Sequence, residues 1–367
     1  MATSDRNNEE TTWHFYRWSK DTWEAMISAL ESAAISIDFE QYYFVDLASG
    51  RIGGRFLDVL EKKARQGVRV RLLLDATGSW EFYVSTTANR LRAAGAQVAF
   101  HETLPLRDAS RFFHSFLRDH RRLLVIDGAA AFVGGTAIKE AARMWRDTHV
   151  ELRGGIVRAL ACEFDEIWKS VAEGLRHRQS ALVARAGSWS VLPNGIRPSH
   201  RFIARFFLEG IRHAQKSIYV STPYFAPNHQ LFRALRLAAL RGIDVRLLLP
   251  QRSDSRFAER AAESYYSGAL RAGIRIFLYE PSFLHSKTIV IDDDWASVGS
   301  SNFDYLSMSF NYELNVLSYS SRFALEIKNH FFEDLQSAAE VMPEEWNGRF
   351  FLRKIFEKAL IPLRIFV

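Results

Sequence analysis

The sequence predicts an α/β fold made of one structural unit used twice. Similar stretches recur about 180 residues apart, as in "SAAISIDFEQYYF" (32–44) and "HAQKSIYVSTPYF" (213–225). Both copies alternate β-branched runs with helical periodicity. A repeat of this length exceeds the unit of a solenoid. We therefore expect two packed α/β sandwich domains related by a pseudo-twofold axis.

The elements of each half follow in the same order. A helical pattern (55–67 and 231–242) leads into a short apolar strand (68–75 and 243–250), and a second helix and strand follow. Each of these helices ends at a glycine, the residue that most easily adopts the left-handed conformation of a helix C-terminus. These glycines are Gly67, Gly95, Gly242 and Gly273.

We expect a first domain over residues 1–185, a second over 186–340 and a tail over 341–367. The junction near 172–200 contains a short strand, "WSVLP". The first half also carries an insert, "ETLPLRDASRFFHSFLRD" (102–119), before its motif strand. The insert fits either a surface loop folded over the core or a gate that mixes phosphate-attracting Arg with lipid-compatible Phe.

Composition indicates a globular protein with an anionic partner. Hydrophobic residues make up 48% of the 367 residues and the net charge is +6, so nucleic acid, phosphate groups or an acidic lipid surface would each fit. Cys162 is the only cysteine, which excludes an internal disulfide. The polar start "MATSDRNNEETT" is unlike a signal peptide, and no apolar run reaches about 18 residues. We expect a protein that is soluble or held on a membrane surface.

A paired motif carries the chemistry. "HRRLLVIDGAAAFVGGTA" (120–137) and "HSKTIVIDDDWASVGSSN" (285–302) share a His, a cation two residues later, then Asp and Gly at identical spacing. Residues i and i+2 of a strand face the same way, so His120 with Arg122, and His285 with Lys287, should project into one pocket. An imidazole beside a fixed cation suits an anionic phosphodiester.

Carboxylates and small turns complete the candidate site. Asp147 lies 27 residues after His120, and Glu313 lies 28 after His285. We expect each carboxylate to orient the imidazole of its own half. Asp127 and Asp292 belong to the motif and are included with the candidate catalytic residues, although their place at strand ends favours a structural role. The turns that follow supply candidate phosphate-binding residues, which are Gly135, Thr136, Ser300 and Asn302.

The second motif, from His285 to Asn302, resembles the signature of the phospholipase D superfamily at every position. The segments "NFDYLSMSFNYELNVL" (302–317), "TPYFAP" (222–227) and "WRDTHVEL" (145–152) are similar to bacterial cardiolipin synthases, in particular the shorter type without amino-terminal membrane spans. The resemblance covers about residues 13–340. It implies two phospholipase D-like domains with the active site at their interface.

The resemblance further implies a metal-free mechanism without cofactor. One His attacks phosphorus to form a covalent phosphatidyl-histidine, while the other protonates the leaving alcohol and then activates the incoming one. The family pattern makes His120 the nucleophile and His285 the acid and base, although the sequence does not enforce this. The expected partners are phosphatidylglycerol, phosphatidylethanolamine and an anionic membrane at the cytoplasmic face of a bacterial inner membrane. No nucleic acid is expected, and the oligomeric state stays open.

The first motif departs from this pattern. Arg122 replaces the family's Lys, and Ala137 stands where Asn is expected. Arg is always charged and can hold phosphate with two parallel hydrogen bonds, so we expect an altered but active first half. The missing Asn should remove one hydrogen-bond donor from the phosphate. Leu306, where many relatives carry Arg, is a lesser departure.

The carboxyl-terminal sequence "RFFLRKIFEKALIPLRIFV" (349–367) predicts an amphipathic basic helix. It fits either a helix docked on the core or one lying in the head-group region of an anionic membrane, and we favour the membrane. Other functions stay open: a hydrolytic phospholipase D with water as acceptor, a superfamily phosphodiesterase or nuclease, or a non-catalytic protein that binds anionic lipid.

Overall fold

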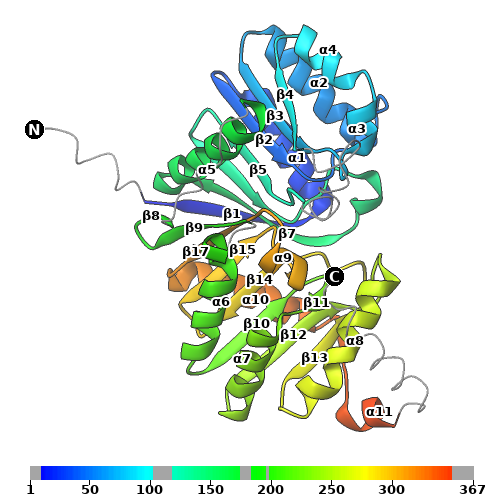
Figure 1. Cartoon of the computed structure of the whole chain (residues 1–367), viewed down its shortest axis with the longest axis vertical. Helices are drawn as coiled ribbons and strands as arrows, with labels where there is room; N and C mark the ends of the chain where they lie inside the picture. The colour runs from blue at the N-terminus through cyan, green and yellow to red at the C-terminus, as the bar shows by residue number, and fades with distance from the viewer. Residues whose placement is uncertain (1–9, 102–117, 174–182, 196–197, 349–367) are drawn as a thin grey trace, which may run out of the picture.

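The computed structural model describes residues 10–101, 118–173, 183–195 and 198–348. The chain folds into two α/β halves stacked along the long axis of the molecule (Figure 1). The predicted insert lies almost entirely outside the described residues, as does the predicted tail helix.

The first half is built on a seven-stranded sheet in the order β1-β7-β6-β5-β2-β3-β4. Its elements are β1 (Thr12–Trp18), α1 (Ser19–Ser32), β2 (Ser36–Gln41), α2 (Ile52–Arg65), β3 (Arg69–Asp75), α3 (Trp80–Val84), α4 (Thr87–Ala93), β4 (Gln97–His101), β5 (Arg122–Ile126), β6 (Ala130–Gly134), β7 (Arg146–Arg153) and α5 (Gly155–Ala172).

The second half is built on a nine-stranded sheet in the order β18-β13-β12-β10-β14-β15-β17-β9-β8. Its elements are β8 (Ala184–Ala186), β9 (Trp189–Asn194), α6 (Phe202–His213), β10 (Ser217–Ser221), β11 (Phe225–Ala226), α7 (His229–Leu240), β12 (Asp244–Pro250), α8 (Arg256–Leu270), β13 (Arg275–Tyr279), β14 (Thr288–Ile291), β15 (Trp295–Gly299), β16 (Phe303–Asp304), α9 (Tyr305–Ser309), β17 (Glu313–Ser318), α10 (Ser321–Leu335), β18 (Ala338–Glu340) and α11 (Pro343–Asn347).

The two sheets repeat one strand order. β1-β7-β6-β5-β2-β3-β4 corresponds to β9-β17-β15-β14-β10-β12-β13, and β8 and β18 are additions at the edges of the second sheet. In both halves the three strands after the first helix run parallel, and the motif strands are antiparallel hairpins. The predicted duplication is therefore confirmed. The strand expected in the junction is β9, and it pairs with β17 as β1 pairs with β7.

Local sequence explains the helices that cover the sheets. α2 buries Ile52, Phe56, Leu60 and Ala64, which recur every four residues and so form one face. The chain leaves this helix through Gly67, whose φ of 86° is a left-handed conformation. A side chain with a Cβ would be strained there, so the predicted glycine stop has a direct conformational cause.

The halves share one apolar core as well as having a core each. A single cluster joins β5–β7 and α5 of the first half to β14, β15, β17 and α10 of the second, and it includes Val133, Val150, Phe164, Val290, Val298 and Phe323. A buried ion pair between Arg146 on β7 and Asp334 on α10, 2.7 Å apart, also crosses the junction. The expected domain boundary at residue 185 falls inside β8, which belongs to the second sheet.

Candidate active site

The two motif histidines meet at the junction of the halves because each is held by the backbone of the opposite half. The His120 amide donates to the carbonyl of Tyr312 at 2.9 Å, and the His285 amide donates to the carbonyl of Arg146 at 2.7 Å. Each histidine precedes its motif strand, β5 or β14. The exchange places both imidazoles, which are 9% and 5% exposed, at one cavity.

The orienting carboxylates are exchanged in the same way, which corrects the expected pairing within each half. The Nδ1 atom of His120 lies 2.9 Å from an oxygen of Glu313, not of Asp147. The Nδ1 atom of His285 lies 2.7 Å from an oxygen of Asp147. Tyr312 and Arg146 immediately precede the two carboxylates in sequence. Their carbonyls bind the opposite histidine, so each carboxylate necessarily reaches the imidazole of the other half.

Burial has a large effect on the pKa values of the two histidines and of Asp147. Burial, aided by the Lys287 ammonium, lowers the pKa of His285 to about 3, although Asp147 opposes the shift. Burial likewise lowers the pKa of His120. Although its own burial acts the other way, His285, which is protonated in the acidic range where Asp147 titrates, lowers the pKa of Asp147 to about 2. Both imidazoles are therefore neutral near pH 7. Each Nδ1–H donates to a carboxylate, which leaves the lone pair of the ring on Nε2.

The two motif cations occupy the site differently. Lys287 donates from Nζ to the His285 carbonyl at 2.6 Å. Arg122 donates to the His120 carbonyl at 3.0 Å and also lies 3.1 Å from His120 Nε2. Burial lowers the pKa of Lys287 to about 7, so its charge is sensitive to neutral pH. A guanidinium keeps its charge at every physiological pH.

The turns after the motif strands do not all face a substrate. Asn302 is 5% exposed and lines the cavity. Ser300 is used inside the protein instead, since its hydroxyl donates to Glu313 at 2.5 Å. Gly135, the equivalent of Ser300, leaves room for Asp147, because a Cβ there would lie 2.4 Å from the carboxylate.

Two further expectations in the first turn are corrected. Thr136 is buried, and its hydroxyl lies 3.4 Å from that of Thr22 in the core rather than in the cavity. Ala137 is also fully buried, and its carbonyl accepts from the Trp23 indole at 2.9 Å. The position that would hold the missing Asn is thus part of the core under α1.

Asp127 and Asp292 are structural, which corrects their inclusion with the catalytic set. They end the motif strands at the side opposite the histidines, with left-handed φ values of 53° and 52°. Asp127 accepts from the amides of residues 34–36, and Asp292 accepts from those of residues 215–217. Each carboxylate thereby ties the motif hairpin to the start of the neighbouring strand.

A cavity of about 350 Å³ opens beside the histidines. Its walls include residues that the motifs alone do not identify: Tyr42, Tyr43, Arg118, Trp145, Tyr224, Asp254, Phe257 and Asn311. Some of these follow the internal repeat, since Tyr43 and Tyr224 are equivalent in the two copies and so are Trp145 and Asn311. The repeat could have identified these four. Asp254 and Phe257 are identified by neither the motifs nor the repeat.

Comparison with known proteins identifies the family. Residues 26–168 and 207–335 match the domain described as "Cardiolipin synthase, PLD-like domain". The chain belongs to this family. It is 36% identical to a cardiolipin synthase of Geobacillus kaustophilus, over 92% of this chain and 69% of the relative. It is 32% identical to cardiolipin synthase A of Pseudomonas putida, over 89% of this chain and 69% of the relative. The chain is a cardiolipin synthase-like phosphatidyltransferase of the phospholipase D superfamily, as the resemblance implied.

Solved structures show the same fold at low sequence identity. The phosphatidylserine synthase of Haemophilus influenzae superposes with a TM-score of 0.72 at 12% identity, covering 99% of this chain and 98% of that one. The polyphosphate kinase of Porphyromonas gingivalis gives 0.62 at 13% identity, over 91% of this chain and 49% of that one. In the part of the chain that the structure describes, no helix has the length and apolarity needed to cross a membrane.

Proposed function

We propose that this phosphatidyltransferase makes cardiolipin, through a covalent phosphatidyl-histidine, from phosphatidylglycerol and a second phospholipid. The observation that carries the proposal is the exchanged pair of His–carboxylate contacts at one cavity. Two imidazoles, each held at Nδ1 by a carboxylate, line this space together with Arg122, and the ammonium of Lys287 contacts the backbone of His285, so the space suits one phosphodiester. One phosphodiester can thus be attacked from one side and protonated from the other.

The reaction has two balanced steps. In the first, Nε2 of one histidine attacks phosphorus and the bond to the head-group oxygen breaks, while the other histidine gives that oxygen a proton. In the second, the same second histidine removes the proton from a hydroxyl of phosphatidylglycerol. That oxygen attacks phosphorus, and the phosphorus–nitrogen bond breaks. The central glycerol of cardiolipin comes from the acceptor, so the acceptor must carry a glycerol head group.

The geometry supports either histidine as nucleophile, and we keep His120 in that role with His285 as acid and base. A second proton on the His285 ring requires a pKa well above about 3. The anionic phosphodiester raises that pKa when it binds, because it offsets the charge of Lys287. The proton is thus stabilised only when there is a leaving group to receive it.

Incubation of the purified full chain with phosphatidylglycerol vesicles tests the proposal, with the lipids resolved by mass. Cardiolipin and free glycerol are expected. Phosphatidic acid as the main product would instead indicate a hydrolase. No product with or without phosphatidylethanolamine would contradict the proposed function.

We also propose that the rim of the cavity rests on an anionic bilayer. Phe257, which lines the cavity, is 38% exposed, and Met144, beside the lining residue Trp145, is 55% exposed. Trp80 is 51% exposed and follows Ser79, whose hydroxyl donates to the carbonyl of Tyr42 in the cavity wall. Large apolar side chains around a lipid-binding opening suit insertion between head groups.

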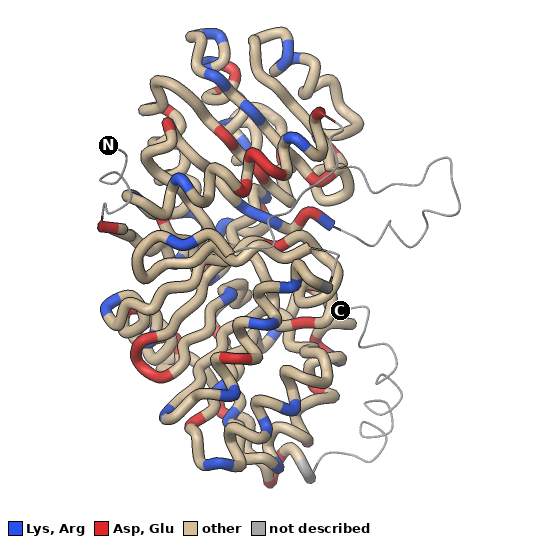
Figure 2. Tube along the Cα trace, turned by 60° about the vertical axis from the view of Figure 1, so that its left-hand side comes forward, with Lys and Arg blue, Asp and Glu red and all other residues tan. Residues whose placement is uncertain are grey.

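Nearby cations fit the same orientation. Arg252 and Arg256 flank Asp254 near the start of α8, are exposed, and form no ion pair within the described residues. They would meet acidic lipid head groups. Lys and Arg elsewhere are spread over both halves in the described chain (Figure 2). That distribution is unlike the basic stripe expected for a nuclease.

Vesicle co-sedimentation tests this surface with a matched control. Trp80→Ser combined with Phe257→Ser should weaken binding to phosphatidylglycerol vesicles at least tenfold, since each large apolar side chain contributes about 1.5–3 kcal/mol when buried. The control is Leu237→Ser with Leu240→Ser, two exposed leucines on α7, away from the cavity. Loss of binding in the control pair alone would place the membrane contact on α7 instead.

A further inference from the structure

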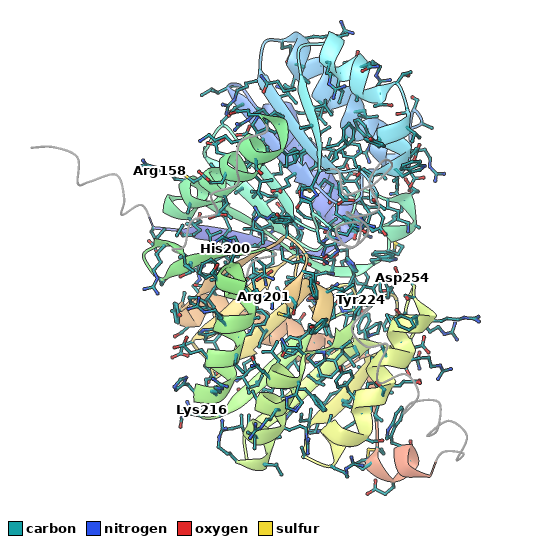
Figure 3. All side chains as sticks on the ribbon, viewed as in Figure 1. Arg158, His200, Arg201, Lys216, Tyr224 and Asp254 are labelled. Atoms are coloured by element: carbon teal, nitrogen blue, oxygen red, sulfur yellow. The ribbon has the colours of Figure 1, made fainter. Side chains whose placement is uncertain are left out.

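One wall of the cavity carries a carboxylate that phosphate binding does not explain. Asp254 lines the cavity, is exposed, and accepts a 2.6 Å hydrogen bond from the Tyr224 hydroxyl. Figure 3 shows Tyr224 and Asp254 close together at the side of the second half that faces the first. A negative charge here opposes the binding of an anionic phospholipid. The Asp254 carboxylate must therefore either stabilise the local fold or bind a part of the substrate other than the phosphate.

The local fold does not need this carboxylate. Asp254 stands just before α8, where an acidic side chain often caps the helix. The cap is already supplied by Ser255, whose hydroxyl accepts from the Ala258 amide at 3.3 Å. The hydroxyl of Ser253 accepts from the Ser255 amide at 3.1 Å. Asp254 is therefore not needed as the helix cap. The Tyr224 hydroxyl donates to one of its oxygens and holds the carboxylate at the cavity wall.

A second, independent feature marks the same cavity as a place for hydrogen-bond donors. Asn311 is 8% exposed and lines the cavity, and its Oδ1 atom has no partner among the described residues. Asn302 is 5% exposed and has an unpartnered Oδ1 as well. Buried acceptors without partners are costly unless a ligand satisfies them. A phosphate has no donors to offer these oxygens, whereas a glycerol head group has hydroxyls.

The position relative to the histidines fits an alcohol. Asp254 accepts from Tyr224, whose ring lies 6.4 Å from that of Phe283, and the Phe283 ring lies 5.7 Å from the His285 imidazole. Asp254 therefore lies on the His285 side of the site, where the leaving alcohol departs and the entering alcohol arrives. Both alcohols of the reaction carry donors, as hydroxyls in glycerol or as an ammonium in ethanolamine.

We infer that Asp254, held by Tyr224, forms with Asn311 an alcohol subsite that binds the donor-bearing head group entering and leaving the reaction. This subsite rests on the proposed transfer mechanism and deepens it, because it gives the enzyme a way to prefer a glycerol head group over water. The carboxylate accepts from a hydroxyl that water or a simple alcohol cannot present at the same place.

A competition experiment tests this. Wild type and Asp254→Asn are given phosphatidylglycerol vesicles with a fixed amount of ethanol, and cardiolipin and phosphatidylethanol are both measured. Both products arise from one phosphatidyl-enzyme, so their ratio depends only on the acceptor step. We expect the ratio of cardiolipin to phosphatidylethanol to fall about tenfold, equal to about 1.4 kcal/mol. Tyr224→Phe should lower the ratio by less.

The control is Asp244→Asn, the same substitution at an aspartate outside the cavity that also accepts from a tyrosine, Tyr219, at 3.0 Å. It should leave the ratio unchanged. A fold defect in Asp254→Asn would lower both products together and leave the ratio at the wild-type value. That unchanged ratio would overturn the subsite while leaving cardiolipin synthesis intact. Absence of cardiolipin from wild type would instead reject the proposed function itself.

A second arm separates the two head groups. Phosphatidylethanolamine labelled in its head group is mixed with phosphatidylglycerol, and release of ethanolamine and glycerol is followed. A larger fall in ethanolamine release than in glycerol release in Asp254→Asn shows that the subsite also binds the ammonium. Equal falls confine its role to hydroxyls, and no fall in either, with an unchanged product ratio, overturns it.

Discussion

The two halves have the same strand order and the same motif, yet they surround their histidines differently. In the second half Lys287 donates to the backbone carbonyl of His285, and the Ser300 hydroxyl donates to Glu313. In the first half Arg122 reaches Nε2 of His120, and Gly135 leaves space for Asp147. Each carboxylate contacts the histidine of the opposite half, so the turn residue beside that carboxylate, Ser300 or Gly135, also affects the histidine of the opposite half. Substitutions in one half should therefore act on the histidine of the other.

The largest effect is expected from removing either imidazole. His120→Ala and His285→Ala should each lower cardiolipin synthesis by at least about 10³-fold, because a nucleophile or a general acid is lost. If His120 is the nucleophile, His285→Ala will still form some phosphatidyl-enzyme, detectable by intact-protein mass. Near-normal turnover in either variant would refute the two-histidine mechanism.

The crossed carboxylates give the next largest effect. Asp147→Asn and Glu313→Gln should each reduce the rate by about 10²- to 10⁴-fold, since the imidazole loses its fixed tautomer. The crossing itself is tested by the histidine NMR signals. Glu313→Gln should shift the ring signals of His120 most strongly, and Asp147→Asn those of His285. The reverse assignment would contradict the exchange between halves.

The small residues of the turns should matter next, and unequally. Gly135→Ala brings a Cβ to 2.4 Å from the Asp147 carboxylate, so it should displace Asp147 and impair His285. Ser300→Ala removes one hydrogen bond to Glu313, a loss of about 0.5–1.5 kcal/mol or up to roughly tenfold in rate. Steady-state rates compare the two. If Gly135→Ala lowered the rate less than Ser300→Ala, β7 would be able to shift and accommodate the added methyl group without displacing Asp147 from His285.

The pH dependence should separate the two cations. Lys287, whose pKa burial lowers to about 7, is charged below that pH and loses its charge above it. The KM for the anionic donor should therefore rise as the pH is raised through neutrality. Lys287→Arg keeps the charge and should flatten this rise. A KM that rises equally in both proteins would assign the titration to another group.

The smallest rate effect is expected where the first motif departs from its family. Ala137→Asn should not restore a phosphate ligand, because the side chain would enter the core below Trp23. It should lower the free energy of unfolding by about 1–3 kcal/mol, measured by denaturant melts. Arg122→Lys should free Nε2 of His120 and raise the rate by less than about tenfold. A faster Ala137→Asn enzyme of normal stability would contradict this reading.

Much of the fold could be predicted because its signals are local. The stops at Gly67 and Gly242 depend on a left-handed backbone that glycine tolerates, and the motif spacing repeats within one chain. The role of β9 could not be predicted. A short strand can pair with any strand that has a free edge. The free edge of β17, with which β9 pairs, exists only once the second sheet has formed.

The sequence by itself determined the duplication, the two histidines with their cations, and the carboxylates that would serve them. Only the tertiary structure decided which carboxylate serves which histidine, and that Thr136 and Ala137 face the core. Equal spacing along the chain leaves pairing within a half and pairing between halves equally possible. The carbonyls of Arg146 and Tyr312 accept from the amides of the histidines of the opposite half. These backbone hydrogen bonds place Asp147 and Glu313 beside those histidines.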